Sequence, residues 1–171
     1  MAAQAALPTP KMFTPAGADV LKVTSTAIHA LGSKARGEYG QEYVYVLSSG
    51  SLALGALVAI DEAFTARGGT TALAKTAGGP GWPQVAFATD QYGWVAVAGR
   101  KLYGKQKDGT AADAQLYTST SVGIMGTDAS TGAPVLIAGV RNVALTSGAG
   151  AAYEICAVNP HFILSPGAPI T

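Results

Sequence analysis

The residue types that carry out nucleophilic and metal chemistry are scarce in this sequence. It holds one cysteine, Cys156, and two histidines, His29 and His161. The histidines lack the spacing of a metal site, such as two histidines four apart on a helix, so we expect no metal. Cys156 and His161 could act as nucleophile and base only within hydrogen-bond reach. Because Cys156 falls in an apolar run, we expect a buried, inert thiol there.

The acidic residues and the glycines show no catalytic pattern either. The ten carboxylates are scattered, and Asp61 and Glu62 are their only adjacent pair. Consecutive residues on a strand point to opposite faces, so these two carboxylates could not act together as general acid and general base there. The glycine-rich segments are not followed by Gly-Lys-Ser or Gly-Lys-Thr, which argues against a phosphate loop. We therefore expect no enzyme activity and no cofactor.

One local cluster of basic residues could bind a partner. Arg100, Lys101, Lys105 and Lys107 lie close together in the chain, with Tyr103 between them. The cluster is either a contact for an acidic protein surface or a solvated hairpin whose edge lysines discourage unwanted strand pairing. The sequence leaves both interpretations open.

Two tryptophans and two apolar residues near the N-terminus complete the candidate partner contacts. Trp94 lies in an expected strand and is assigned to the core. Trp82, between a glycine and a proline, is expected in a loop, where it would be exposed for an interface. Met12 and Phe13 lie in a proline-rich segment and would serve as its apolar anchors.

The low content of charged residues bears most strongly on function. Charged residues make up 12% of the 171 residues and hydrophobic ones 49%, with a formal net charge of +1; an average soluble protein is about 25% charged. Such a surface does little to keep monomers apart, so we expect an oligomer or a lattice component. The alternative is a monomer whose alanines and glycines inflate the hydrophobic count. Without an excess of lysine and arginine, we expect no direct contact with nucleic acid.

The cysteine count and the apolar segments bear on the cellular compartment. One cysteine cannot form an intramolecular disulfide, so a reducing cytoplasm suits the chain. The first residues lack the basic segment and the apolar run of a secretory signal. An uncharged stretch over residues 43–60 approaches the length of a membrane span, but serines and glycines interrupt it. We interpret it as two strands joined by a turn and expect no membrane contact.

The elements that must position these residues are mostly strands. Residues 42–47 alternate tyrosine and leucine with valine, a pattern typical of a strand that is covered on both faces. Many short β-forming runs with glycine-rich turns between them predict an all-β fold, either a compact antiparallel β-sandwich or a small β-barrel. A helical pattern over residues 61–76 is interrupted by two glycines and predicts a loop, or at most a turn or two of helix. The expected strands cover residues 42–47, 56–60, 84–88, 94–98, 101–103, 115–118, 123–125, 134–140, 141–146 and 153–158.

The distribution of prolines divides the chain into an arm, a body and a tail. Three prolines within residues 1–18 disfavour helix and inner strand. We expect an extended N-terminal arm over residues 1–30, a β-domain over residues 31–164 and a C-terminal tail over residues 165–171. An arm of this kind becomes ordered when a partner lies beneath it.

Two parts of the sequence resemble small virion proteins of tailed bacteriophages. The match spans roughly residues 37–118, with a looser continuation through Val140. It rests on the runs GEYGQEYVYV (37–46), SLALGALVAID (51–61), DQYGWVAVAG (90–99) and ADAQLYT (112–118). The resemblance implies a capsid decoration, or cement, protein, which is a β-rich trimer on the outside of the capsid. It supplies no binding residues that can be carried over one by one.

Three functional hypotheses follow. The preferred one is a structural virion protein, made in the host cytoplasm, that sits on the outer capsid surface as a homotrimer and bridges adjacent major capsid subunits. The alternative is a β-rich binding module, fibre-associated or carbohydrate-binding, with Tyr39, Trp82 and Tyr92 as its available aromatic residues. The third and weakest is a small hydrolase that uses Cys156 and His161.

Overall fold

Strands make up almost all of the regular structure in this protein, which confirms the all-β prediction. The computed structural model describes residues 19–76, 78–127, 134–148 and 151–163. Two short helical turns are present, η1 (Glu38–Gly40) and α1 (Thr71–Ala74). The strands are β1 (Lys34–Arg36), β2 (Glu42–Ser48), β3 (Val58–Ile60), β4 (Thr65–Gly68), β5 (Gly79–Pro83), β6 (Tyr92–Lys105), β7 (Gln115–Thr118), β8 (Met125–Gly126), β9 (Leu136–Asn142) and β10 (Ala152–Ile163).

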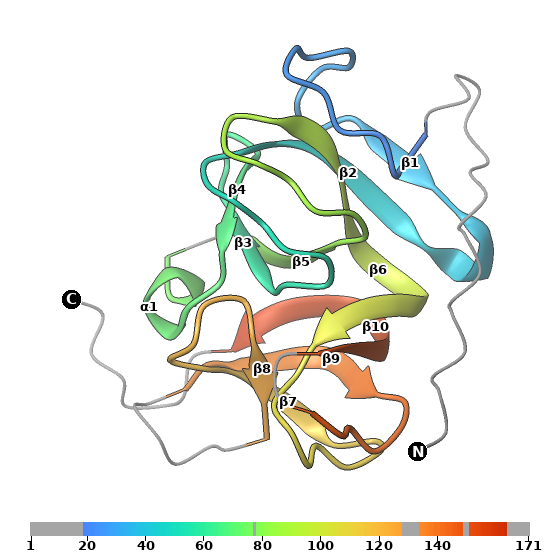
Figure 1. Ribbon diagram of the computed structural model, residues 1–171, viewed down its shortest axis with the longest axis vertical. Helices are drawn as coiled ribbons and strands as arrows, with labels where there is room; N and C mark the ends of the chain where they lie inside the picture. The colour runs from blue at the N-terminus through green and yellow to red at the C-terminus, as the bar shows by residue number, and fades with distance from the viewer. Residues whose placement is uncertain (1–18, 77, 128–133, 149–150, 164–171) are drawn as a thin grey trace.

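Five of the strands close into a barrel. The ring runs in the order β2-β4-β3-β5-β6 and closes because β6 also pairs with β2. Its neighbouring strands are antiparallel except for β2 and β4, which are parallel. β1 adds to the barrel by pairing with β2. The barrel occupies the upper half of the molecule in Figure 1.

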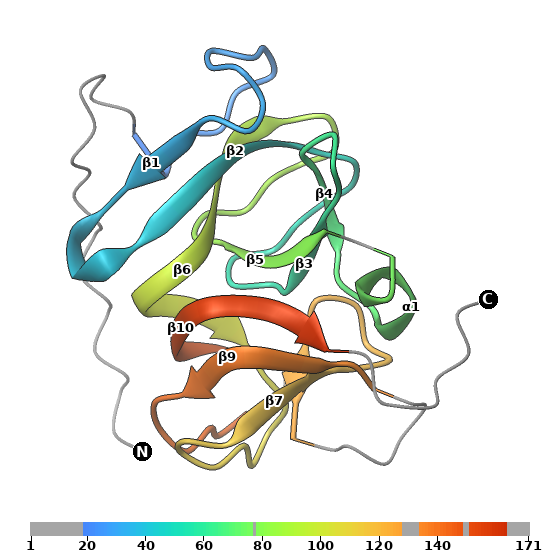
Figure 2. The ribbon, with the colours of Figure 1, turned by 180° about the vertical axis from the view of Figure 1, so that it is seen from behind.

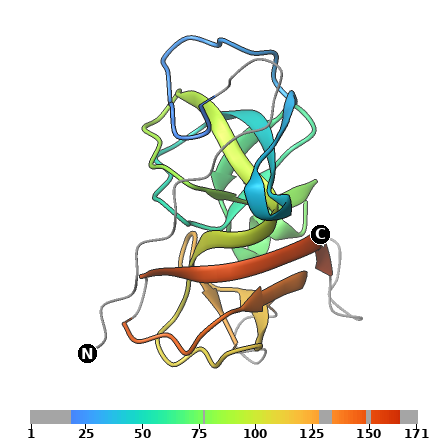
Figure 3. The ribbon, with the colours of Figure 1, turned by 90° about the vertical axis from the view of Figure 1, so that its right-hand side faces the viewer.

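Strand β6 leaves the barrel and becomes the first strand of a second sheet. Its residues 92–98 pair with β2, and its residues 99–105 pair with β10. The sheet continues through β9, β7 and β8. It then curls back, because Gln106 bridges Met125 of β8. Figures 2 and 3 show the second sheet stacked against the barrel, with β6 running from one to the other.

The alternating side chains of β2 enter two different cores, as the sequence pattern predicts. Val44 and Val46 belong to a cluster that also contains Val95 of β6 and side chains of β3 and β4, and this cluster fills the barrel. Tyr43 and Tyr45 point to the opposite face and join a larger cluster that continues into the second sheet. Both faces of β2 are therefore buried.

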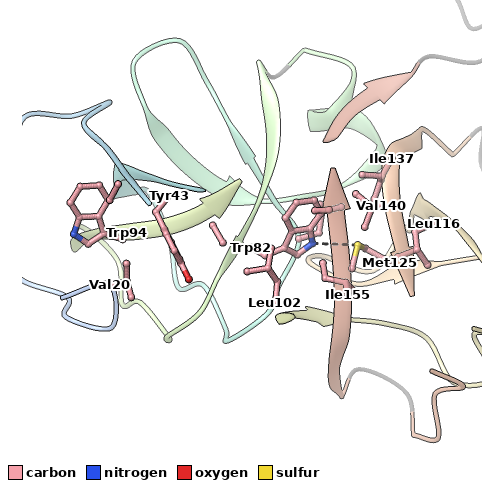
Figure 4. Close-up of a cluster of buried hydrophobic side chains, with 14 of the residues drawn as sticks. Val20, Tyr43, Trp82, Trp94, Leu102, Leu116, Met125, Ile137, Val140 and Ile155 are labelled. Carbon is pink, nitrogen blue, oxygen red and sulfur yellow. Dashed lines mark hydrogen bonds between the residues drawn. The ribbon is translucent and has the colours of Figure 1, made fainter. Parts of the chain in front are cut away.

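Trp82 lies in this larger cluster, so the prediction that it is exposed in a loop is wrong. The side chain is 0% exposed, and its Nε1 donates a hydrogen bond to Sδ of Met125 at 3.4 Å. Figure 4 shows it between the barrel and the second sheet. The glycine-rich run forms β5 because Gly81 allows close packing: an added Cβ would lie 2.6 Å from Cγ1 of Val95.

Residues 19–30, which the sequence assigns to the arm, contact the barrel. Val20 is buried in the larger core, and Thr24 bridges the first residue of β6. The ring of His29 packs edge-on against Tyr45, with 5.1 Å between centroids. The anchors Met12 and Phe13, together with the predicted tail over residues 165–171, lie outside the described residues.

The predicted strand over residues 115–118 coincides with β7, the one over residues 42–47 covers all but the last residue of β2, and the one over residues 153–158 lies within β10. Those over residues 56–60, 123–125 and 134–140 overlap β3, β8 and β9 with shifted ends, and the one over residues 141–146 reaches β9 only at residues 141 and 142. Residues 84–88 form one isolated bridge instead of a strand, and residues 94–98 and 101–103 belong to the single strand β6. Residues 61–76, predicted as a loop with at most a turn or two, contain β4 as well as the single turn of α1. β4 forms because it pairs with β2 and β3, two strands from elsewhere in the chain.

The bend of β6 depends on Gly99. Its φ is +124°, and an added Cβ would lie 2.5 Å from Cα of Gln41. Gln41 is 1% exposed, and its Nε2 donates to the carbonyl oxygens of Arg100 at 3.0 Å and Lys101 at 3.4 Å. Its Oε1 accepts a hydrogen bond from the hydroxyl of Tyr43 at 3.0 Å. The buried amide therefore holds β6 in the direction in which it leaves the barrel.

We predict that Gly99→Ala lowers the free energy of unfolding by at least about 2 kcal/mol, because backbone strain adds to a clash with Gln41. Gly109→Ala is the matched control, since Gly109 also has a positive φ but has no atom within 4 Å of an added Cβ. The control should cost about 1 kcal/mol. Urea unfolding of the two variants measures the difference, and equal losses would contradict a role for close packing at the bend.

Candidate functional site

Irregular strand pairing is concentrated where β6 bends. The β2–β6 register shifts between Glu42 and Tyr43. The β10–β6 register shifts between Ile155 and Ala157, and the β10–β9 register shifts between Ala157 and His161. These are three of the four register shifts in the described ladders. Such bulges redirect side chains and are common beside functional sites.

Strained backbone gathers at the same place. Tyr39 has a φ of 60°, Lys101 of 55° and Asn159 of 48°. They are three of the six described residues other than glycine that have a positive φ. Conformations of this kind cost on the order of 1–3 kcal/mol each and tend to cluster at binding and catalytic sites. The bend of β6 is therefore the strongest candidate region for a functional site.

These irregular segments surround a groove of about 540 Å³, which we call the corner groove. Its walls come from η1 and the start of β2, from residues 97–100 of β6 and from residues 157–160 of β10. Val158 is 65% exposed and Tyr39 is 43% exposed. The groove thus offers accessible apolar and aromatic surface between the barrel and the second sheet.

Two cations of the predicted basic cluster lie at the corner groove. Arg100 is exposed and lines it, and Nζ of Lys101 lies 4.2 Å from the ring centroid of Tyr39. Glu42, on the opposite wall, pairs with Arg36 at 3.5 Å, the one ion pair found among the described residues. Arg100 therefore faces the groove and Lys101 lies over Tyr39 beside it, and neither has a carboxylate partner in the described part of the chain.

The other two members of the basic cluster lie farther along the chain. Lys101 and Lys107 are six residues apart, which corresponds to roughly 20 Å along an extended chain. The side chain of Lys107 packs beside Gly126, whose added Cβ would lie 2.9 Å from Cδ of Lys107. Strand β6 pairs with β5 only at residues 95 and 96 and with β10 along residues 99–105, and the N–H of Lys105 donates to the carbonyl oxygen of Gly55 at 2.6 Å. The backbone N–H of Lys105 is therefore already paired, while the interpretation of the cluster as edge lysines stays a prediction.

Cys156 and His161 do not form the hydrogen-bonded pair that a hydrolase would need. Both lie on β10, where they pair with different residues of β9 on the two sides of a register shift. Nδ1 of His161 lies 3.0 Å from the carbonyl oxygen of Asn159. The expectation of a buried thiol is wrong, because Cys156 alternates with buried Ile155 and Ala157 and is partly exposed on the outer face of the sheet.

The described residues contain neither a cluster of metal-ligating side chains nor a membrane-spanning helix. No group of three or more histidine, cysteine, aspartate or glutamate residues lies close enough there to hold a metal ion. None of the described helices has the length and apolar character needed to cross a membrane. The corner groove is thus the principal candidate site of the described structure.

Sequence reasoning named the cations and Tyr39 at the corner groove but missed other components of the bend. Gln41, Val158 and Asn159 were not singled out. Two local signals point to them: a glycine inside a strand pattern at Gly99 indicates a bulge or a close backbone approach, and an Asn-Pro pair at residues 159–160 indicates a turn. Neither signal shows that the two segments meet.

Comparisons with protein-family models, with curated proteins and with solved structures gave no match. No relative is therefore available to assign a role to the corner groove.

Burial raises the pKa of the Tyr43 phenol well above its usual value of 10.0. The hydroxyl is enclosed and donates to Gln41, so ionisation would bury a charge. The folded state therefore keeps its proton at a pH where an unfolded chain releases it. The contribution of Tyr43 to stability is fully present below pH 10 and is lost as the pH rises above that value.

We predict that the unfolding free energy of the wild type falls more steeply above pH 10 than that of Tyr43→Phe. The difference in slope should approach about 1.4 kcal/mol per pH unit. At neutral pH the variant should be less stable by about 1 kcal/mol, because Oε1 of Gln41 loses its donor. Urea unfolding from pH 7 to pH 11 measures both effects, and parallel curves would contradict the proposed burial of the phenol.

Proposed function

We propose that this protein is a structural virion component that decorates the outer surface of a phage capsid as a homotrimer and stabilises it by bridging adjacent major capsid subunits. The observation that carries the proposal is the low content of charged residues in a chain whose surface exposes many apolar groups. Charged residues are 12% of the chain. Leu145 is 69% exposed, and Val122 and Val158 are each 65% exposed. Neighbouring proteins that cover such groups would gain about 25 cal/mol per Å² of apolar area.

The distribution of these exposed side chains supports contact with more than one neighbour. Val122 follows β7, Leu145 follows β9 and Val158 lies within β10. Val158 lines the corner groove, whereas Val122 lies beside Gly68 of β4, where an added Cβ would be 2.4 Å from Cγ1 of Val122. The body that carries them is well packed, with the two cores joined through both faces of β2. A rigid body with several small apolar contacts suits a protein that acts in many copies on one shell.

The alternative, a fibre-associated or carbohydrate-binding module, depends on exposed aromatic side chains. Of the three that the sequence offers, Trp82 is fully buried. Tyr92 is partly buried and stacks on Tyr45 with 6.4 Å between centroids. Tyr39 is the most exposed of the three and already contacts Lys101. This supply is small for a sugar platform, which favours the virion proposal.

We predict that the purified full chain sediments as a trimer of 17.1 kDa subunits. We also expect the genome that encodes it to encode a major capsid protein, whose assembled shells bind the trimer and melt at a higher temperature once decorated. Analytical ultracentrifugation, cryo-electron microscopy of the shells and calorimetry test these points. A stable monomer, or shells that bind none of it, would contradict the proposal, and specific signals on a glycan array would favour the alternative.

We predict that deletion of residues 1–17 lowers both the occupancy of the shell and its melting temperature, because the apolar anchors Met12 and Phe13 are lost. Deletion of residues 165–171 is the comparison variant and should have the smaller effect. Circular dichroism should show that the β-body of both variants is intact. If the N-terminal deletion left the occupancy and the melting temperature of the shell unchanged, the arm would have no role in holding the protein to the shell.

A further inference from the structure

We propose that a hollow at the mouth of the barrel receives Met12 and Phe13 from the arm segment, residues 1–18, of a second copy of this chain. The inference rests on the proposed function, because it identifies a contact that would hold the copies of the homotrimer together. It is drawn from an inward-facing glycine of β5, from the side chains around the hollow and from the sequence of the arm segment.

The hollow has a volume of about 320 Å³ and opens onto the core of the barrel. Val44, Ile60 and Val97 line it from β2, β3 and β6, and all three belong to the barrel cluster or pack against it. Pro80 and Phe64 line it as well, and Phe64 is 36% exposed. The hollow therefore presents apolar surface from the barrel core and from the turn between β3 and β4.

An inward-facing glycine leaves this hollow open. Gly79 and Gly81 lie two residues apart in a regular part of β5, so their Cβ positions point to the same face of the sheet. An added Cβ at Gly81 would lie 2.9 Å from Cδ1 of Ile60, whereas one at Gly79 would have no atom within 4 Å. Gly79 lines the hollow and is not among the residues with a positive φ. Neither close packing nor backbone conformation requires a glycine there, and its missing side chain leaves room for an occupant.

The charged side chains that line the hollow leave one carboxylate available to the occupant. They are Lys34, Asp61 and Glu62, which together give a net charge of −1. Oδ1 of Asp61 accepts hydrogen bonds from the N–H groups of Ala63 at 3.0 Å and Thr65 at 2.8 Å. Glu62 is exposed and has no ion pair or hydrogen bond within the described residues. An occupant with one positive charge would therefore balance the charge of the hollow and find a free partner in Glu62.

The arm segment has the composition that such a hollow requires. Met12 and Phe13 are adjacent apolar residues, and Lys11 before them is the only charged side chain among residues 1–18. The prolines of the segment disfavour helix and inner strand, which suits entry in an extended form. Burial of the Met12 and Phe13 side chains would supply most of the affinity, and Lys11 beside Glu62 would set the orientation.

The place where the described chain begins favours the arm segment of a second copy. Val20 is buried in the larger cluster, on the face of β2 that carries Tyr43. The hollow lies on the opposite face of β2, which carries Val44. The copy's own arm segment would have to pass round the edge of the sheet to enter it. Met12 lies seven residues before the first described residue, up to roughly 25 Å along an extended chain, which is enough to reach a neighbour in contact.

Variants of the hollow and of the arm segment test the inference. Gly79→Leu should fill the hollow and raise the dissociation constant of the oligomer by at least about tenfold, because Phe13 is then excluded. Phe13→Ala should raise the constant by a similar factor. The double variant should match the weaker single variant to within about threefold, because both changes remove the same contact.

Gly50→Leu is the matched control for the filled hollow. An added Cβ at Gly50 also has no atom within 4 Å, its φ is not positive and it does not line the hollow. The control should leave the dissociation constant unchanged. Sedimentation velocity over a dilution series gives the constants, and circular dichroism checks that each variant is folded. Phe13 precedes all of the strands in the chain, so Phe13→Ala keeps the inference testable if Gly79→Leu fails to fold.

Photochemical crosslinking identifies the copy that supplies the arm segment. The variant Phe13→benzoylphenylalanine is mixed with wild-type chain that carries a heavy nitrogen isotope, so that peptides of the two copies differ in mass. After irradiation, mass spectrometry should find the probe joined to residues of the hollow, such as Ile60 or Pro80, in the heavy chain.

Each other outcome has a definite meaning. A trimeric wild type whose assembly is unaffected by Gly79→Leu and Phe13→Ala would overturn the inference and leave the proposed function standing. Additive losses in the double variant, or crosslinks that stay within one copy or fall outside the hollow, would overturn it too. A wild type that stays monomeric alone and on shells would overturn the proposed function itself.

Discussion

The contact between Gly99 and Gln41 sets the path of β6, and the arrangement of the whole molecule depends on that path. A buried amide binds the backbone on the far side of the bend, and the glycine leaves no space between the two segments. As a result one strand contributes its first half to a closed barrel and its second half to a different sheet. The two cores then share β2 and β6 as common walls, so neither half can shift without disturbing the other.

The corner groove is a consequence of this bend. A strand that changes partners cannot keep a regular register, so bulges collect in the adjoining ladders of β2, β9 and β10. The displaced backbone brings Arg100 and Lys101 to the surface without acidic partners, and it leaves Val158 exposed. An architectural requirement of the fold thereby creates the surface that is best suited to binding.

The proposed role depends on one physical property of the chain. A chain with few charges keeps them where they specify a neighbour and leaves the remaining surface to small and apolar side chains that neighbours can cover. The corner groove has two of these charges among its lining residues, Arg100 and Glu42. Exposed side chains such as Leu145 and Val122 lie outside the groove and, under the proposed function, would be covered by other subunits or by the shell.

Local pattern was enough to determine the all-β class and the strand over residues 42–48, because alternation along a strand reports burial on each face directly. The low content of charged residues and the local cluster of basic residues were also evident from the sequence. The place of Trp82 was decided by tertiary structure, since the glycines beside it permit either a loop or the close strand packing that occurs. Local sequence pattern could not predict the corner groove either, because Tyr39, Arg100 and Val158 are distant in the chain. Long-range pairing across a bent strand brings them together.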